Sequence, residues 1–342
     1  MKPTMSDVAR AAGVSAMTVS NVLTGRRRVG AATRARVQQA AADLGYELNL
    51  TARHLRAGRT DTVALVVPHF DHPYYGELAA RLARLLAADG RHLVVEQTGA
   101  SRQAELAAVG QARWQLYDGV LLSVVGMSAA DVADLETSVP LVLLGEQEMP
   151  ARWDHVRMDN VAGARLATAH LLATGSRRVA IVGGTDPAPE GGMMPARTAG
   201  WSAAHTDAGT VPAPELLVPA PSDPFHGRDA VRRLLREGIA FDAVFAVTDT
   251  LATGVLAGLA EAGLRVPQDV QVVGFDNLAT SELTVPALTT VDPAHEQMAA
   301  DALRLLDRLG TGRSGVGAPD GPPAEHVTAP VRLIPRATTR PA

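Results

Sequence analysis

Residues 4–23 read TMSDVARAAGVSAMTVSNVL, and this stretch decides the fold of the chain's front end. Thr4 and Asp7 have the spacing of a capping box, in which two side chains satisfy free amides at a helix start. Gly13 permits the left-handed turn that ends such a helix, and Ser15 is placed to cap a second one. The stretch therefore predicts two short helices joined by a tight turn.

The second helix is expected to have one apolar stripe and one outward face. Its inward residues are Val19, Val22 and Leu23, and its outward residues are Ala16, Met17, Ser20 and Asn21. A third helix is predicted over residues 31–44, ended by Gly45. Its inward residues are Val37, Ala41 and Leu44. Three short helices with a glycine turn between the first two form the helix-turn-helix plan, so an all-α DNA-binding head is predicted over residues 1–48.

Charge divides the chain close to the same place. Residues 1–60 hold ten Lys and Arg against three Asp and Glu, a balance of +7. Because the whole chain is −4, residues 61–342 carry −11. A basic head on an acidic body favours binding to phosphates. The alternative is a generic helical bundle with a solvated loop at Arg26-Arg27-Arg28. It does not explain why the glycine turn between two short helices and the excess of positive charge occur in the same segment.

Residues 49–58, NLTARHLRAG, add a second signal for DNA binding. They can form a short helix capped by Asn49 and ended by Gly58. A helix of this length is unstable alone, so we expect it to order on DNA or against a second copy. Leu55 has no evident core to join, and an apolar side chain on a basic helix suits a minor-groove wedge. The alternative for this segment is a plain linker.

The chain resembles the lactose-repressor (LacI/GalR-type) family of bacterial regulators over nearly its full length. The motifs that carry the resemblance at the front are TMSDVA at 4–9, GVS at 13–15, TVS at 18–20, TR at 33–34, LGY at 44–46 and ARHL at 52–55. Two positions depart from the family pattern, since Leu48 stands where Pro is common and Gly30 where a Ser usually caps the third helix.

The resemblance implies that Ala16, Met17 and Asn21 are the main base-reading positions and that Leu55 is the hinge-helix wedge at the operator centre. Ala16 and Met17 lack a strong hydrogen-bonding group, so their readout would rely on apolar contact, while Asn21 suits adenine. The full set of expected DNA-binding residues is Thr4, Met5, Ser15, Ala16, Met17, Thr18, Ser20, Asn21, Thr33, Asn49, Arg53 and Leu55.

From Thr62 onward, short apolar runs alternate with amphipathic helices in two successive sets. Strands are predicted over residues 63–67, 92–96, 120–125 and 141–144, then over 179–182, 216–218, 244–247 and 270–274. Helices are predicted over residues 76–88, 101–116 and 130–138, then over 162–174, 191–208, 227–237 and 251–262. This pattern predicts two doubly wound, parallel-sheet α/β lobes that close on a small molecule at the strand ends. The Gly- and Pro-rich run 310–323 is expected to be a flexible loop.

The resemblance extends through this body and implies a periplasmic-binding-protein-like core. Its motifs here are VRMDN at 156–160, RTAGW at 197–201, RVP at 265–267, VVGFD at 272–276 and LTTV at 288–291. The implied chain crossovers lie near residues 160, 290 and about 320. The N-terminal lobe is thus expected to hold residues 61–160 and about 291–320, and the C-terminal lobe 161–290 and about 321–342.

The first strand of the body is followed by an aromatic cluster that predicts a ligand-binding wall. In a chain with 4% aromatics, Phe70, Tyr74 and Tyr75 fall within six residues. Aromatic faces among polar groups suit a sugar, so the expected contacts are His69, Asp71, Tyr74 and Tyr75. Either Tyr could instead pack under the following helix. A metal site at His69, Asp71 and His72 would need a further ligand of fixed geometry.

Four further ligand contacts are expected after the second set of strands begins. Arg197 is carried over from the family pattern and can bind hydroxyl pairs, with a surface ion pair as its alternative. Asp249 and Asp276 end strands, where carboxylates hold hydroxyls, although Asp276 could cap a loop. The family often has Asn at the position of Thr248, so the polar groups of this protein's ligand are expected to differ from those of the best-known relatives' ligands. Asp118 suits a structural cap, and the candidates for either cleft edge or core are Trp153, Trp201 and Phe225.

These observations together predict a ligand-controlled transcription regulator, in this family most often a repressor. It would act as a homodimer on a near-palindromic operator, with a sugar as the expected effector; no heptad run favours a tetramer. The chain has no Cys, no long apolar run and no leader-like segment, which fits a cytoplasmic protein without a membrane. A sugar-transport protein would suit the body alone. An enzyme lacks any phosphate loop or nucleophile signature, and no cofactor or metal is expected.

Overall fold

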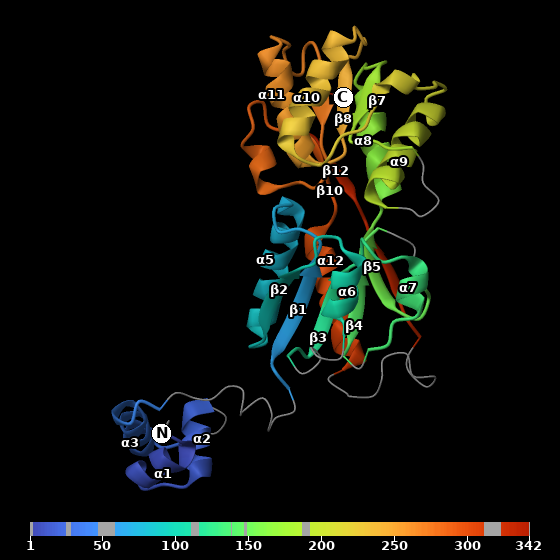
Figure 1. Ribbon diagram of the computed structural model, residues 1–342. Coiled ribbons are helices and arrows are strands. Elements are labelled where there is room, and N and C mark those ends of the chain that lie inside the picture. The colour runs from blue at the N-terminus through green and yellow to red at the C-terminus, as the bar shows by residue number, and fades with distance from the viewer. Residues whose placement is uncertain are drawn as a thin grey trace. The chain divides into compact units, whose positions relative to one another are not determined.

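The computed structural model describes residues 3–24, 29–46, 59–110, 116–137, 139–146, 149–186, 192–310 and 323–341. The chain divides into two compact units, Met1–Thr60 and Asp61–Ala342. The first unit is all-α, and the second consists of two α/β lobes (Figure 1). The predicted fold class is therefore confirmed.

The head is the predicted three-helix unit. Its helices are α1 (Met5–Ala12), α2 (Ala16–Thr24) and α3 (Ala31–Asp43). Thr4 and Asp7 form the capping box, and Gly13 takes the left-handed conformation with φ 61°. The core of the head consists of Val8, Ala9, Ala12, Val19, Val22, Val37, Ala40 and Ala41. The expectation for Leu44 was wrong: α3 ends before it, its side chain is 39% exposed, and Ala40 takes the inward position.

The N-terminal lobe is built on a six-stranded sheet in the order β11-β5-β4-β3-β1-β2, with every pairing parallel. Its strands are β1 (Thr62–Val67), β2 (His92–Gln97), β3 (Gly119–Ser123), β4 (Leu141–Leu144), β5 (Asp154–Met158) and β11 (His326–Ala329). Its helices are α5 (Pro73–Ala88), α6 (Arg102–Ala108), α7 (Ala129–Ala133) and α12 (His295–Leu309). Because helices cover both faces, the central strands β1, β3 and β4 are apolar on both sides.

The C-terminal lobe repeats this plan with a four-stranded parallel sheet in the order β7-β6-β8-β9. Its strands are β6 (Val179–Val182), β7 (Leu217–Val218), β8 (Ala243–Ala246) and β9 (Gln271–Val273). Its helices are α8 (Asn160–Ala173), α9 (Met193–Asp207), α10 (Pro224–Arg236) and α11 (Asp249–Glu261), with 3₁₀ turns at Pro214–Leu216 and Ala279–Glu282. All eight predicted strands of the two lobes are present, with ends within two residues of the prediction.

The chain passes between the lobes three times, and the third crossing is later than expected. Residues 321–342 were assigned to the C-terminal lobe, but β11 pairs with β5 in the N-terminal sheet, from His326 opposite His155 onward. The crossing therefore follows Ala329. Next to it, β10 (Thr290–Asp292) and β12 (Arg332–Ile334) form a short antiparallel pair. The backbone of β11 forms hydrogen bonds with the outer edge of β5, whose amide and carbonyl groups would otherwise lack partners.

Other differences concern element lengths and elements that were not predicted. Helix α7 ends at Ala133 instead of residue 138, and α6 ends at Ala108, while part of its predicted extension lies outside the described residues. The strands β5, β10, β11 and β12 were missed because they are short and mix polar with apolar residues. Helix α12 was also missed, although its buried residues recur at helical spacing. Residues 311–322 of the expected loop lie outside the described part.

Close contact between α10 and α11 depends on glycines. A Cβ at Gly254 would lie 1.8 Å from the carbonyl oxygen of Pro224, and one at Gly227 would lie 2.2 Å from that of Leu251. These distances leave no room for a methyl group, so the two helices pack backbone to backbone.

Gly254→Ala should destabilise the second unit by roughly 1–3 kcal/mol or more, because the helices must separate to admit the methyl group. Gly76→Ala in α5 is the matched control, since a Cβ there meets nothing within 4 Å; it should be stabilising by about 0.5–1 kcal/mol. Urea unfolding of both variants measures the difference. Equal stabilities would contradict the backbone contact.

Candidate functional site

The outward face of α2 is the candidate DNA interface of the head. Ala16 is exposed and Met17 is 72% exposed, while Ser20 and Asn21 are half-buried. The Ser15 hydroxyl accepts a hydrogen bond from the Thr18 amide at 3.1 Å, so Ser15 caps the helix as predicted. Met17, on this outward face, is not part of the core of the head.

Other expected DNA contacts have structural roles or lie outside the described residues. The Thr4 hydroxyl is bound to Asp7 at 2.6 Å, and Met5 packs partly against the core of the head. Thr33 is half-buried on α3, whose N-cap Gly30 provides no side-chain hydrogen bond, as its residue type implies. The expected DNA contacts that lie outside the described residues are Asn49, Arg53 and Leu55. The arginines of the alternative solvated loop, Arg26-Arg27-Arg28, and the departing Leu48 also lie outside them.

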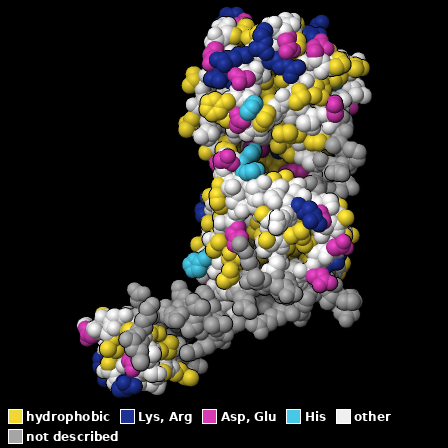
Figure 2. Space-filling model, in the orientation of Figure 1, with side chains coloured by type: hydrophobic (Ala, Val, Ile, Leu, Met, Phe, Trp, Pro, Cys, Tyr) yellow, Lys and Arg dark blue, Asp and Glu magenta, His cyan; other side chains and the backbone are white. Residues whose placement is uncertain are grey.

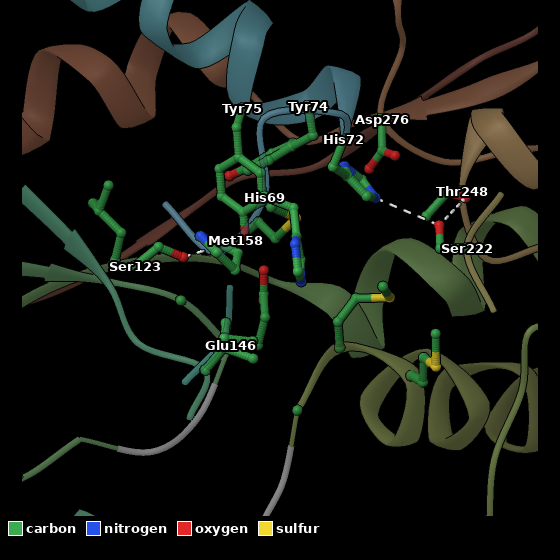
Figure 3. Close-up of a pocket in the computed structure, with 18 of the residues that line it drawn as sticks. His69, His72, Tyr74, Tyr75, Ser123, Glu146, Met158, Ser222, Thr248 and Asp276 are labelled. Carbon is green, nitrogen blue, oxygen red and sulfur yellow. Dashed lines mark hydrogen bonds between the residues drawn. The ribbon is translucent and has the colours of Figure 1, made fainter. Parts of the chain in front are cut away.

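A cavity of about 320 Å³ lies where the two lobes of the second unit meet, at the carboxyl ends of the strands (Figure 3). Its polar and aromatic lining from the N-terminal lobe is His69, His72, Tyr74, Tyr75, Ser123 and Glu146. From the C-terminal lobe it is Arg197, Ser222, Thr248 and Asp276, with Met193 and Met194 beside them. Figure 2 shows histidine side chains at the junction of the lobes.

The aromatic wall of the cavity is formed by both tyrosines. The rings of Tyr74 and Tyr75 meet edge to face with centroids 5.0 Å apart. The Tyr74 hydroxyl donates to the Met298 sulfur at 3.6 Å, so this side chain is anchored against α12 and offers its ring to the cavity. The Tyr75 hydroxyl lies 3.2 Å from the hydroxyl of Ser123, and burial raises the pKa of Tyr75 to about 12. Both side chains therefore line the cavity, and Tyr74 also packs in the core.

Arg197 is not a surface ion pair, because its side chain is only 2% exposed. Its guanidinium carbon lies 3.5 Å from the centroid of the Phe275 ring, a cation–π contact. Its Nε donates to Asn160 Oδ1 at 2.7 Å, and Nη1 donates to the Val247 carbonyl and lies 3.6 Å from Asp276 Oδ1. The position and orientation of this cation are thus fixed on several sides.

Asp276 is held in the cavity wall by an unusual backbone. Its φ is +117°, a backbone angle that residues other than glycine rarely adopt. Its amide donates to the Val291 carbonyl at 2.9 Å. Burial raises the pKa of Asp276 well above its ordinary value, against the opposing effect of the Arg197 charge. Oδ2 has no hydrogen-bond partner among the described residues. Strain and an unpartnered oxygen at one residue point to a binding role.

Two expected ligand contacts lie outside the cavity lining. Asp249 faces inward at the start of α11, where its Oδ2 accepts from the Ser281 hydroxyl at 2.6 Å and the Leu278 amide at 3.0 Å. Asp249 therefore ties the 3₁₀ turn at Ala279–Glu282 to the lobe, and burial raises the pKa of Asp249 to about 6. Asp71 is exposed and does not line the cavity. By contrast, Thr248 lines the cavity and caps α11 through the Leu251 amide at 3.2 Å.

Sequence reasoning missed the lining residues that follow strands without an aromatic or charged run. Glu146 stands two residues after β4, which was a signal that the prediction did not use. His72 was considered only as a metal ligand; its Nε2 lies 3.4 Å from the Ser222 hydroxyl, which itself lies 2.8 Å from that of Thr248. Burial lowers the pKa of His72 to about 4, so it is neutral at pH 7.

The remaining candidates have structural roles. Trp153 and Trp201 are buried, and their indole nitrogens donate to the carbonyls of Val132 and Val179. Phe225 is 68% exposed beside Arg228, and Asp118 accepts from the Asp61 amide at 2.8 Å. Within the described residues no three His, Asp or Glu side chains gather as a cation site requires, and no helix is long and apolar enough to span a membrane.

Comparison with known proteins assigns the chain to a family. Residues 4–49 match the bacterial regulatory proteins of the lacI family, and residues 168–339 match a periplasmic binding protein-like domain. The HTH-type transcriptional regulator CelR of Thermobifida fusca is 35% identical over 345 residues, covering 97% of this chain and 95% of that protein. The chain belongs to the lacI family of bacterial regulatory proteins. The HTH-type transcriptional repressor PurR of Erwinia tasmaniensis is 32% identical, covering 90% of each chain.

Solved structures agree with this assignment. A lac repressor dimer bound to operator and the anti-inducer ONPF superposes with a TM-score of 0.79 at 26% identity, over 99% of each chain. A CelR–cellobiose complex gives a TM-score of 0.69 at 31% identity, over 98% of this chain and 99% of that one. As a member of the lacI family, the protein is a DNA-binding transcription regulator and not an enzyme.

One wall of this regulator's cavity depends on a buried carboxylate. Glu105 in α6 accepts from the amides of Val125, Gly126 and Met127 at 3.1, 2.8 and 2.9 Å. Because Val125 lines the cavity, Glu105 fixes the path of the backbone that forms this wall. Gly126 also lets this backbone pass close to Ala100, since a Cβ at Gly126 would lie 2.4 Å from the Ala100 carbonyl oxygen.

Glu105→Gln should lower the free energy of unfolding by about 1–3 kcal/mol, because an amide can accept through only one oxygen and brings an unwanted donor. Gln103→Ala, exposed on the same helix, is the control and should change it by less than about 0.5 kcal/mol. Urea titration measures both. If Glu105→Gln and the control unfolded with equal free energies, contacts other than Glu105 would hold the segment from Val125 to Met127.

Proposed function

We propose that this lacI-family regulator is a cytoplasmic repressor that binds a near-palindromic operator as a homodimer and is controlled by a neutral sugar between its lobes. Residues 1–48 would contact the major groove, and residues 49–58 would form the hinge helix with Leu55 as a minor-groove wedge. Residues 61–342 would hold the effector. Cytoplasmic action follows from the proposed target, since the operator lies on chromosomal DNA.

The observation that carries this proposal is a cavity lined by residues of both lobes, in a chain that also has a helix-turn-helix head. A ligand that contacts both lobes favours the angle between them at which its contacts are best. It can shift DNA affinity by as much as its own affinity differs between the two arrangements. The proposed contacts are His69, Tyr75, Arg197, Thr248 and Asp276.

The charges of the lining support a neutral effector. The described lining holds two carboxyl groups, those of Glu146 and Asp276, one guanidinium, that of Arg197, and no Lys. The carboxylates accept hydrogen bonds from hydroxyl groups, and the aromatic wall suits the apolar face of a sugar ring. Arg197 already lies 3.6 Å from Asp276 and donates to Asn160 at 2.7 Å, so a phosphate or carboxylate on the ligand would compete with these partners for the guanidinium. Among relatives, CelR was solved with cellobiose and another is named a ribose operon repressor, which supports a sugar.

Asn21→Ala should relax the base preference at one position in each half-site and cost ~1–3 kcal/mol on the preferred base pair. The loss is expected because a carboxamide forms two hydrogen bonds with adenine, whereas a methyl group forms none. A duplex selected by the wild-type protein from random DNA is the probe, with binding measured on it and its point variants.

Gln38→Ala, an exposed change on α3, is the control for this measurement and should leave the base preference intact. Equal weakening of every duplex by Asn21→Ala would make Asn21 a phosphate contact. Failure of the wild-type protein to select any sequence would contradict the proposed repressor.

Neutral sugars should raise the melting temperature of the wild-type protein, whereas sugar phosphates and uronic acids should not. A thermal-shift screen of pentoses, hexoses, disaccharides and nucleosides, each with its anionic counterpart where one exists, tests this. For the sugar that binds, Arg197→Ala and Asp276→Ala should each cost about 1.5–3 kcal/mol of affinity, because a charged hydrogen-bonding group loses its partner. Half-saturation would then rise more than about tenfold.

Asp71→Ala is the matched control, because Asp71 is an exposed acidic residue after β1 that does not line the cavity. Its half-saturation should equal that of the wild type. A preference for anionic sugars would overturn the neutral effector, and unchanged affinity in both cavity variants would place the site elsewhere.

A further inference from the structure

Asn160 lies at the point where the chain first passes from one lobe to the other. It is the first residue of α8 and follows β5 by one residue, Asp159, which caps the helix through the Ala162 amide at 2.9 Å. Its side chain is 5% exposed and is not part of the cavity lining. A polar side chain so placed must find its hydrogen bonds within the protein.

The Asn160 carboxamide joins a charged group of each lobe. Its Nδ2 donates to Glu146 Oε2, which follows β4 in the N-terminal lobe. Its Oδ1 accepts from Arg197 Nε at 2.7 Å, on α9 in the C-terminal lobe. Both partners line the cavity. Arg197 continues the connection to Asp276 at 3.6 Å, so four side chains form one polar chain from lobe to lobe.

Only a carboxamide suits this position. It must donate to a carboxylate and accept from a guanidinium at the same time, and Asn has one group of each kind at its tip. An Asp of the same size can accept from Arg197 but would place a second negative charge against Glu146. An apolar side chain would leave both charged groups without this partner in a partly buried site, which is costly.

We propose that Asn160 is a positioning residue that sets the angle between the two lobes and orients Glu146 and Arg197 toward the effector. Its part in effector control rests on the proposed function, whereas its part in the lobe angle does not. Other side-chain hydrogen bonds between the lobes are His72 with Ser222 at 3.4 Å and Glu77 with the Ala279 amide at 3.3 Å, both on the α5 side, and Arg197 Nη2 with the Met158 sulfur at 3.5 Å. Each of these is a single hydrogen bond, whereas the Asn160 carboxamide uses both of its polar atoms and joins Glu146 of one lobe to Arg197 of the other.

The lobe angle can be measured by pulsed electron-spin resonance, because the chain contains no Cys. Ala107→Cys on α6 and Ser202→Cys on α9 place one exposed labelling site on each lobe. The full chain carrying two nitroxide labels is diluted with an excess of unlabelled protein, so that each pair of spins belongs to one chain. No sugar and no DNA are added.

Asn160→Asp should widen or displace the distance distribution between the labels. Adding Glu146→Gln to Asn160→Asp should restore the wild-type distribution, because the exchange places an amide opposite a carboxylate again and leaves the acceptor for Arg197. Recovery by a reciprocal exchange is not expected of a residue that merely fills space. Thr168→Ala, a buried polar change on the same helix, is the control and should leave the distances unchanged.

A wild-type distribution in Asn160→Asp would overturn the proposal, and so would a double variant no narrower than Asn160→Asp alone. If Asn160→Asp fails to fold, the double variant decides, since only a restored bridge returns it to a folded state with wild-type distances. A negative result here leaves the proposed repressor intact. A failed sugar screen, in turn, leaves this measurement unaffected.

Discussion

The buried guanidinium of Arg197 is the interaction on which the junction between the lobes depends. A cation that is 2% exposed has lost most of its hydration, so the protein must surround it with acceptors. The Phe275 ring, the Asn160 and Val247 oxygens and the Asp276 carboxylate all serve this purpose. Contact with Arg197 fixes the position of each of these groups, and these groups in turn shape the cavity wall.

Parallel topology explains why residues so distant in sequence meet around this charge. In a doubly wound sheet every strand ends at the same edge, and the loops that follow the strands converge there. In the N-terminal lobe, Tyr75 lies in the first turn of α5 after β1, Ser123 ends β3 and Glu146 follows β4. In the C-terminal lobe, Thr248 follows β8 and Asp276 follows β9. Chain crossings near the cavity then join the two edges, so a small change of angle moves the two sets of loops against each other.

The sequence was sufficient for features that depend on local patterns. The capping box at Thr4, the turn at Gly13 and the eight apolar strands all follow from spacing and residue type. The sequence was insufficient where a residue distant in the chain determines which way a side chain points or whether a segment forms a strand. Asp249 and Asp276 both follow strands, yet three hydrogen bonds turn the first inward while a positive φ turns the second to the cavity. Likewise, β11 is a strand only because β5 offers it an open edge.

Two unpartnered polar atoms, one from each lobe, give the cavity a physical basis for responding to a ligand. Asp276 Oδ2 belongs to the C-terminal lobe and His72 Nδ1 to the N-terminal lobe, and neither has a hydrogen-bond partner among the described residues. Buried atoms of this kind destabilise the arrangement that buries them. A polyol whose hydroxyls reach both atoms removes this cost only at lobe angles where both hydrogen bonds can form. The ligand therefore binds one arrangement more tightly than others, and that difference is the free energy available to alter the affinity for DNA.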